Sequence, residues 1–180
     1  MPENNTPINR PLEQPRRAIV VGASSGLGAA LARRLAARGY RVAAVPRREA
    51  ELAALRDSAG PGLICPYVHD VTEYEQVPLL FDQITRDLGG LDLIIYAAAV
   101  QPPVKLNEYD FAKDEAMIST NLLGAIAWLN QAAARFERAR AGRIVGISSI
   151  AGDRGRVGSP VYNAGKAGLD TYLEALRNRL

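Results

Sequence analysis

The sequence predicts a doubly wound, parallel α/β fold, and two observations lead to it. First, short apolar runs alternate along the chain with longer stretches at helical spacing, which is the pattern of strand, helix, strand, helix. Second, the apolar runs are continuous and not alternating, so helices are expected to cover both faces of the sheet. We expect five strands, at residues 18–21, 41–45, 63–68, 92–97 and 143–148.

Helices are expected between and after these strands. They should occupy residues 27–39, 49–60, about 73–88, about 110–139 and about 160–179. Residues 1–16 precede this pattern and contain four prolines and almost no apolar side chain, so they cannot bury enough surface to offset the entropy lost on ordering. The sequence therefore predicts a disordered tail over residues 1–16 and a single domain over residues 17–180.

The composition argues against several classes of protein. The net charge is +3, but the basic residues are scattered and give no nucleic-acid footprint. No apolar run reaches the roughly 18 residues needed to span a membrane, and the N-terminus lacks the pattern of a signal peptide. The single cysteine, Cys65, excludes an internal disulfide and fits a reducing compartment. We therefore expect a cytoplasmic protein with no membrane or nucleic-acid partner.

A glycine-rich turn joins the first strand to the first helix. It reads Gly22-Ala23-Ser24-Ser25-Gly26-Leu27-Gly28. Gly22 permits a tight turn, Gly26 lets the backbone approach a pyrophosphate, and Gly28 lets the helix pack closely on the sheet. Free N–H groups at the positive end of the helix would hold the pyrophosphate. A turn without a ligand is the alternative, but its place between strand and helix favours a nucleotide site.

Four features together resemble the short-chain dehydrogenase/reductase family. They are the GxxxGxG spacing of this turn, YNAGK at residues 162–166, Ser149 thirteen residues before Tyr162, and Asn121 within STNLLGAI. The resemblance runs from about residue 16 to the end of the chain. It implies a Rossmann-like fold and hydride transfer between a nicotinamide cofactor and a small-molecule carbonyl or alcohol.

The resemblance also implies which nicotinamide cofactor is bound. After the second strand, members that use NAD usually carry an acidic residue, whereas members that use NADP carry arginine for the 2′-phosphate. Here Arg47 and Arg48 follow the strand, with no acid before Glu49. We expect NADP(H), with Arg47 as the first candidate and Arg48 as the second; two solvated arginines at the start of a helix are the alternative.

Further cofactor residues follow from the same resemblance. Asp70 would accept a hydrogen bond from the adenine amino group with Val71 against the ring, although an Asp before a helix can also be a cap. Ser24 and Ser25 would add hydroxyl donors to the phosphate, although serine is common in such turns. The full predicted cofactor set is Gly22, Ser24, Ser25, Gly26, Leu27, Gly28, Arg47, Arg48, Asp70, Val71, Ala97, Ala98, Tyr162 and Lys166.

The resemblance assigns the chemistry to four residues. Tyr162 would act as general acid/base on the substrate oxygen, and Lys166, one helical turn away, would supply the positive charge that lowers the pKa of a phenol from about 10. Ser149 would hydrogen-bond the substrate oxygen, with Ser148 as the alternative. Asn121 would hold a water that relays protons to Lys166, which would also bind the nicotinamide ribose. No metal site is predicted.

The sequence departs from the family pattern at two places. The family often has Asn-Asn-Ala-Gly after the fourth strand, where the amides brace the sheet, but this chain has Tyr96-Ala97-Ala98-Ala99. That bracing must be replaced or absent. Members also usually continue beyond the tyrosine helix into further strands and a substrate-covering segment, whereas this sequence stops at Leu180. We expect the last family strands and one wall of the substrate pocket to be missing, and the fifth strand to be an uncovered edge.

Two hypotheses on function follow. The first is an NADP(H)-dependent reductase or dehydrogenase whose substrate lies between residues 101–109 and 152–160. The second is a non-catalytic NADP(H)-binding module or an inactive fragment, because the pocket is incomplete. The resemblance also implies a homodimer or homotetramer through the helices near 110–139 and 160–179, with Trp128 as a reporter of the interface; core packing is the alternative for their apolar stripes.

Overall fold

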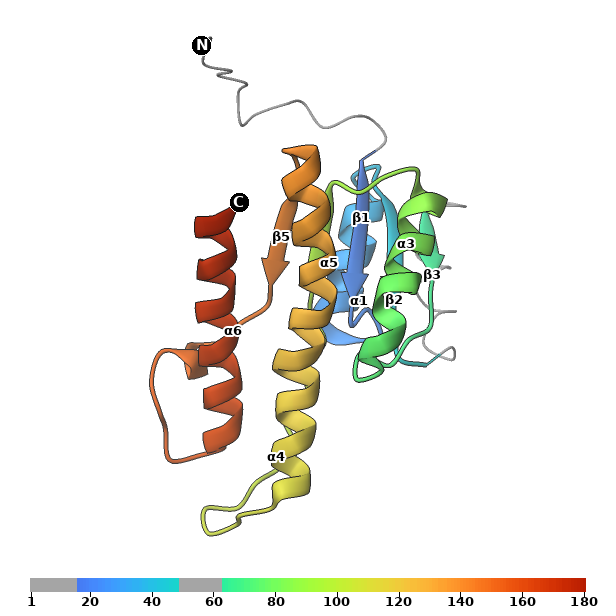
Figure 1. The fold of residues 1–180 in the computed structure, drawn as a ribbon. Helices are drawn as coiled ribbons and strands as arrows, with labels where there is room; N and C mark the ends of the chain where they lie inside the picture. The colour runs from blue at the N-terminus through green and yellow to red at the C-terminus, as the bar shows by residue number, and fades with distance from the viewer. Residues whose placement is uncertain (1–15, 49–62) are drawn as a thin grey trace, which may run out of the picture.

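The five expected strands form one parallel sheet in the order β3-β2-β1-β4-β5 (Figure 1). The computed structural model describes residues 16–48 and 63–180. Its strands are β1 (Arg17–Val21), β2 (Arg41–Val45), β3 (Ile64–Pro66), β4 (Leu93–Tyr96) and β5 (Arg143–Gly146). Its α-helices are α1 (Gly26–Ala36), α3 (Val77–Leu88), α4 (Phe111–Ile118), α5 (Gly124–Ala139) and α6 (Pro160–Arg179), with 3-10 turns at Tyr74–Gln76 and Ile150–Gly152 and a π turn at Ser119–Leu123.

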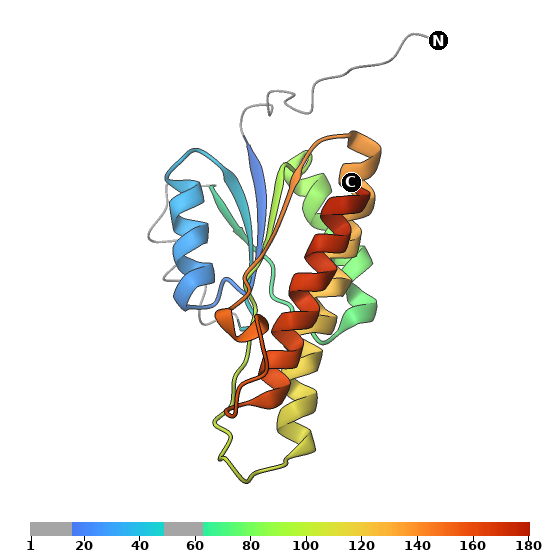
Figure 2. The same cartoon turned by 90° about the vertical axis from the view of Figure 1, so that its left-hand side faces the viewer.

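Helices cover both faces of the sheet, as the continuous apolar strands predict (Figure 2). Alternate residues of β1 point to opposite faces. Ile19 and Val21 pack with residues of α3, α5 and α6, whereas Ala18 and Val20 pack with residues of α1. All four side chains are fully buried. The doubly wound α/β fold is therefore confirmed.

The connection order reverses at β1, in the middle of the sheet. β1 pairs with β2 on one side, where Val21 aligns with Val45, and with β4 on the other, where Val21 aligns with Tyr96. The chain therefore leaves β1 toward β3 in its first half and toward β5 in its second. In doubly wound sheets, such a reversal opens a crevice beyond the carboxyl ends of the strands, where ligands bind.

Several boundaries differ from the sequence-based expectation. β3 and β5 are shorter than expected, and the helix expected near residue 73 begins as the 3-10 turn before continuing as α3. Pro78 lies in the first turn of α3, where its missing N–H breaks no helical hydrogen bond. The expected helix at 49–60 lies outside the described residues, as does the expected tail except for Arg16.

The long helix expected near 110–139 is interrupted in its middle. Asp110 caps α4, since its Oδ1 accepts hydrogen bonds from the N–H groups of Ala112 and Lys113 at 3.0 and 3.4 Å. At the π turn, the N–H of Gly124 donates to the carbonyl of Ser119, five residues earlier. A π turn of this kind frequently marks a functional site.

The apolar stripes of α5 and α6 pack largely within the chain. Leu129, Leu169 and Leu176 are buried in the core. Trp128 is also fully buried, with its ring 5.6 Å from that of His69 and 6.5 Å from that of Phe81, centroid to centroid. Trp128 therefore reports on the core, and the expectation that it reports on an interface is wrong. No described helix combines the length and apolar character that a membrane span requires.

β5 forms the edge of the described sheet, next to β4. Its Val145 is 37% exposed, in contrast to the fully buried residues of β1. Helix α6 covers the other side of the strand closely: a Cβ on Gly146 would lie 2.7 Å from Leu173 Cδ1. β5 therefore leaves part of its apolar surface exposed at the edge of the described sheet.

Candidate functional site

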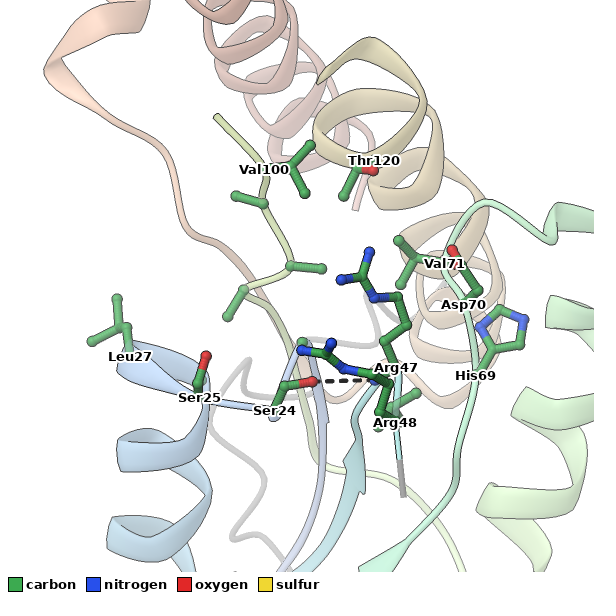
Figure 3. A pocket seen from close by; sticks show the side chains of 16 residues that line it. Ser24, Ser25, Leu27, Arg47, Arg48, His69, Asp70, Val71, Val100 and Thr120 are labelled. Carbon is green, nitrogen blue, oxygen red and sulfur yellow. Dashed lines mark hydrogen bonds between the residues drawn. The ribbon is translucent and has the colours of Figure 1, made fainter. Parts of the chain in front are cut away.

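A cavity of about 280 Å³ lies where the carboxyl ends of β1, β2 and β4 meet (Figure 3). The glycine-rich turn forms one wall, and the segment after β4 forms another. The lining residues are Gly22, Ser24, Ser25, Leu27, Gly28, Val45, Arg47, Arg48, His69, Asp70, Val71, Ala97, Ala98, Ala99, Val100 and Thr120. This is the crevice that the reversal of strand order at β1 predicts.

Most residues of the predicted cofactor set meet at this cavity, although they come from four separate segments of the chain. Gly26 is not among the lining residues; it begins α1 with a left-handed φ of +52°. Tyr162 and Lys166 do not line the cavity either, because they lie on α6. Sequence reasoning missed Val45, His69, Ala99, Val100 and Thr120, whose only signal is that they neighbour predicted residues.

Two glycines of the turn are required by close backbone contacts. Gly22 has φ +83°, and a Cβ there would collide with the backbone of Ala98 after β4. A Cβ on Gly28 would collide with the carbonyl oxygen of Gly22, so only glycine lets α1 approach the turn this closely. The N–H of Gly22 donates to the carbonyl of Val45 at 2.9 Å, which ties the turn to β2.

The N-terminus of α1 has the properties of an anion site. Ser25 occupies the N-cap position, but its side chain makes no capping hydrogen bond, and the first turn contains no acidic residue. The first N–H groups of a helix have no partner within the helix and carry the positive end of its dipole. Because Gly28 and Ser25 also line the cavity, a phosphate held there would meet these N–H groups.

Two arginine side chains project into the same cavity from the end of β2. Figure 3 shows Arg47 and Arg48 between Ser24 and the wall formed by Val100 and Thr120. The backbone N–H of Arg47 donates to Ser24 Oγ at 3.2 Å, so the turn and the arginine segment hold each other in place. The cavity therefore presents two cationic side chains beside a helix N-terminus.

Asp70 lines the opposite side of the cavity as a carboxylate. Its Oδ1 accepts hydrogen bonds from the N–H and the hydroxyl of Thr72, at 3.0 and 2.8 Å. The N–H of Thr72 is the main reason that the pKa of Asp70 lies below its ordinary value. Asp70 thus closes a local turn and does not cap α3, whose N-cap is Gln76. Its neighbour Val71 is buried in the cavity wall.

Lys166 and Tyr162 lie together on α6. Lys166 is only 2% exposed, and its Nζ donates to the carbonyl of Ile147 at 2.7 Å. The same Nζ lies 5.7 Å from the centre of the Tyr162 ring. Burial lowers the pKa of Lys166, and the carboxylate of Asp170 partly opposes this shift. The structure thus fixes a buried amine beside a phenol at the end of β5.

The two candidate serines differ in their hydrogen bonds. Ser149 Oγ accepts from the N–H of Ala151 at 3.1 Å and so begins the 3-10 turn after β5. Its hydroxyl proton is left available for a further acceptor. Ser148 Oγ is buried, and no described residue pairs with it.

Asn121 lies inside the π turn and is 1% exposed. Its Oδ1 accepts from the N–H of Val100 at 2.7 Å, and its Nδ2 donates to the carbonyl of Val100 at 2.9 Å. Asn121 therefore anchors the segment that follows β4. Its side-chain hydrogen bonds to described residues go to Val100 and not to Lys166.

Comparison with known proteins agrees with this arrangement. The model of the short chain dehydrogenase family matches residues 16–180. The chain belongs to this family. An uncharacterized oxidoreductase of Myxococcus xanthus is 39% identical over 164 residues, which cover 90% of this chain and 65% of that protein. The chain thus spans about two thirds of the length of the curated relatives it matches.

Solved structures of short chain dehydrogenase relatives have the same fold. ElxO with NADP bound has 26% identity and a TM-score of 0.79, over 86% of this chain and 63% of that one. An actinorhodin polyketide ketoreductase variant with NADPH has 28% identity and a TM-score of 0.81, over 89% of this chain and 63% of that one. These likenesses confirm the Rossmann-like fold.

His69 is a buried titratable group that lines the cavity, and it is the only histidine of the chain. It is 5% exposed, its Nε2 lies 3.3 Å from the carbonyl of Glu73, and no described residue pairs with its Nδ1. Burial lowers the pKa of His69 below 6.5. The described residues contain no group of side chains that could hold a metal ion with it.

The depressed pKa of His69 predicts a pH dependence of stability. Because the unfolded chain takes up a proton near pH 6.5 and the folded chain does so only at lower pH, the contribution of His69 to stability is fully present above pH 6.5. It is lost as the pH falls from 6.5 toward the folded-state pKa. Denaturant unfolding measured just above and below pH 6.5 should show this decline, and His69→Gln should flatten it. An equal decline in His69→Gln would contradict the prediction.

Proposed function

We propose that residues 17–180 form the NADP(H)-binding catalytic domain of an oxidoreductase. It transfers a hydride between the nicotinamide and a carbonyl or alcohol substrate, with Tyr162 as general acid/base. The observation that carries the proposal is the cavity itself, in which an uncapped helix N-terminus and two arginines face an ionised aspartate.

The residues of the cavity fit NADP(H). The N-terminus of α1 suits the pyrophosphate, and Arg47 and Arg48 suit a 2′-phosphate, which NAD lacks. Asp70 keeps a charged carboxylate that can accept a hydrogen bond from an adenine amino group, with Val71 as apolar surface beside it. The solved relatives that contain NADP or NADPH support the same cofactor.

The chain's own residues then supply the proton chemistry. When bound, NADPH would supply the hydride. The hydroxyl of Tyr162 gives its proton to the substrate oxygen, and the nearby Lys166 stabilises the phenolate that remains. Ser149, whose proton is free, donates a hydrogen bond to the same oxygen and orients it. A ketoreductase among the solved relatives supports a carbonyl substrate.

The direct test is oxidation of NADPH by the purified chain in the presence of a panel of small ketones. Consumption of NADPH that depends on the ketone supports the oxidoreductase. Tight binding of NADPH with no turnover on any ketone favours the alternative of a non-catalytic binding module. Absence of binding contradicts both.

A charge substitution tests the choice of cofactor. We expect Arg47→Ala to weaken NADPH binding at least about tenfold, because a charge-assisted hydrogen bond to the 2′-phosphate is lost, and to leave NADH binding nearly unchanged. Fluorescence titration with each nucleotide measures both affinities. Arg34→Ala, which removes an exposed arginine at the far end of α1, is the control. An equal loss for NADH and NADPH would contradict a role for Arg47 at the 2′-phosphate.

A further inference from the structure

Two tyrosine hydroxyls donate to neighbouring carbonyls of the π turn. Tyr74, in the 3-10 turn before α3, donates to the carbonyl of Ser119 at 3.1 Å. Tyr96, the last residue of β4, donates to the carbonyl of Thr120 at 2.6 Å. The π turn is thus held by two tyrosines from other elements, which precede their partner residues by 45 and 24 positions in the sequence.

The surroundings of Tyr96 favour this hydrogen bond. Its side chain is 1% exposed, and burial raises its pKa well above the ordinary value, so the hydroxyl keeps its proton and remains a donor. A Cβ on Gly124, the first residue of α5, would lie 2.5 Å from the Tyr96 hydroxyl oxygen and 3.0 Å from the carbonyl of Val71. The glycine therefore leaves room for the phenol beneath the turn.

The π turn connects Tyr96 to the cavity. Thr120, whose carbonyl accepts the bond from Tyr96, lines the cavity. The next residue, Asn121, holds both backbone polar groups of Val100, which lines it as well. Figure 3 shows Val100 and Thr120 side by side on the wall that Arg47 and Arg48 face. Movement of the turn would therefore displace this wall.

We propose that Tyr96 is a positioning residue of the cofactor site, which acts through the π turn and Asn121 to fix Val100 and Thr120. Tyr74 supports the same turn at Ser119. In this proposal the Tyr96 hydroxyl takes the place of the side-chain amides that brace the sheet in the family and that Tyr96 and Ala97 lack. The part of the proposal that concerns cofactor affinity rests on the proposed function, whereas the part that concerns the wall does not.

The test compares Tyr96→Phe with Tyr67→Phe. Both variants lose one hydroxyl hydrogen bond and keep the ring, but Tyr67 bonds Asp87 and does not line the cavity. We expect Tyr96→Phe alone to speed hydrogen exchange at the amide of Val100 and over residues 119–124. We also expect the affinity for NADPH to fall about fivefold, which is the effect of one lost hydrogen bond. The KM for NADPH should rise by a larger factor than kcat falls.

A purely structural role would lower the melting temperature of Tyr96→Phe but leave these readouts at the level of Tyr67→Phe, which would overturn the proposal. Tyr74→Phe, at a less buried hydroxyl, should give a smaller change in the same direction if Tyr96→Phe folds poorly. Failure of the unsubstituted chain to bind NADPH would refute the proposed function alone. Hydrogen exchange at Val100 would then still support or overturn the role of Tyr96 at the wall.

Discussion

Substitution of Tyr162 by Phe should reduce turnover by a factor of about 10² to 10⁴, the usual contribution of a positioned general acid. The variant keeps the ring beside Lys166 and loses only the transferable proton. Because Tyr162 belongs to the predicted cofactor set but loses only its hydroxyl, the affinity for NADPH should fall by no more than the effect of one neutral hydrogen bond, about tenfold. Rates of NADPH oxidation and a fluorescence titration on the same preparation measure the two quantities.

Tyr172 provides a matched control on the same helix. Its hydroxyl donates to Asn130 Oδ1 at 2.9 Å, and burial raises its pKa to about 12, so it is poorly suited to exchange a proton near neutral pH. Tyr172→Phe should keep full turnover with a small loss of stability. If Tyr162→Phe and Tyr172→Phe turn over at the same rate, Tyr162 is not the general acid.

Substitution of Gly28 by Ala should have the second large effect, on both folding and binding. The added Cβ meets the carbonyl of Gly22, and the carbonyl carbon lies only 2.9 Å away. Both are backbone atoms, so no side chain can rotate to relieve the contact, and α1 must move away from the turn. We expect a loss of about 1–3 kcal/mol in the free energy of unfolding, as is typical of overpacking.

The same displacement should weaken NADPH binding at least about tenfold, because the N–H groups at the start of α1 move with the helix. Gly155→Ala is the control, since a Cβ there meets no atom within 4 Å. Denaturant unfolding and the NADPH titration should both separate the two variants. Normal binding in a folded Gly28→Ala would show that the turn does not hold the pyrophosphate.

The fold could be predicted from the sequence because its signals are local. Continuous apolar runs such as residues 18–21 report burial on both faces, and their alternation with helical stretches sets the order of layers. The glycine-rich turn was also predictable from its own segment, since Gly22 and Gly26 adopt left-handed φ angles and Gly28 packs against Gly22, although the contact of Gly22 with Ala98 was not. The end of β3 was not, because strand ends depend on pairing partners and not on apolar character.

The candidate site was predictable only in part. The resemblance to the family predicted cofactor roles for Arg47 and Asp70, which do line the cavity, but Val100 and Thr120 carry no motif of their own. In the sequence, Tyr96 stood out only because it occupies a position where the family often has asparagine. Its hydrogen bond to the carbonyl of Thr120 could not be predicted, because the two residues are 24 apart and meet only where β4 packs against the π turn. Gly124 likewise looks ordinary until Tyr96 and Val71 are seen against it.

The π turn also sets how α4 and α5 are rotated about their common axis. Each residue of an α-helix advances the side chains by about 100°, so the residue that a π turn adds shifts the phase of everything beyond it by about that angle. α4 and α5 both contact α6, but α5 also packs against α3, β4 and β5. Deleting one residue of 119–123 would bring the two helices into a single phase and swing the buried Met117 out of its place. The length of this turn is therefore constrained even where the identities of its side chains are not.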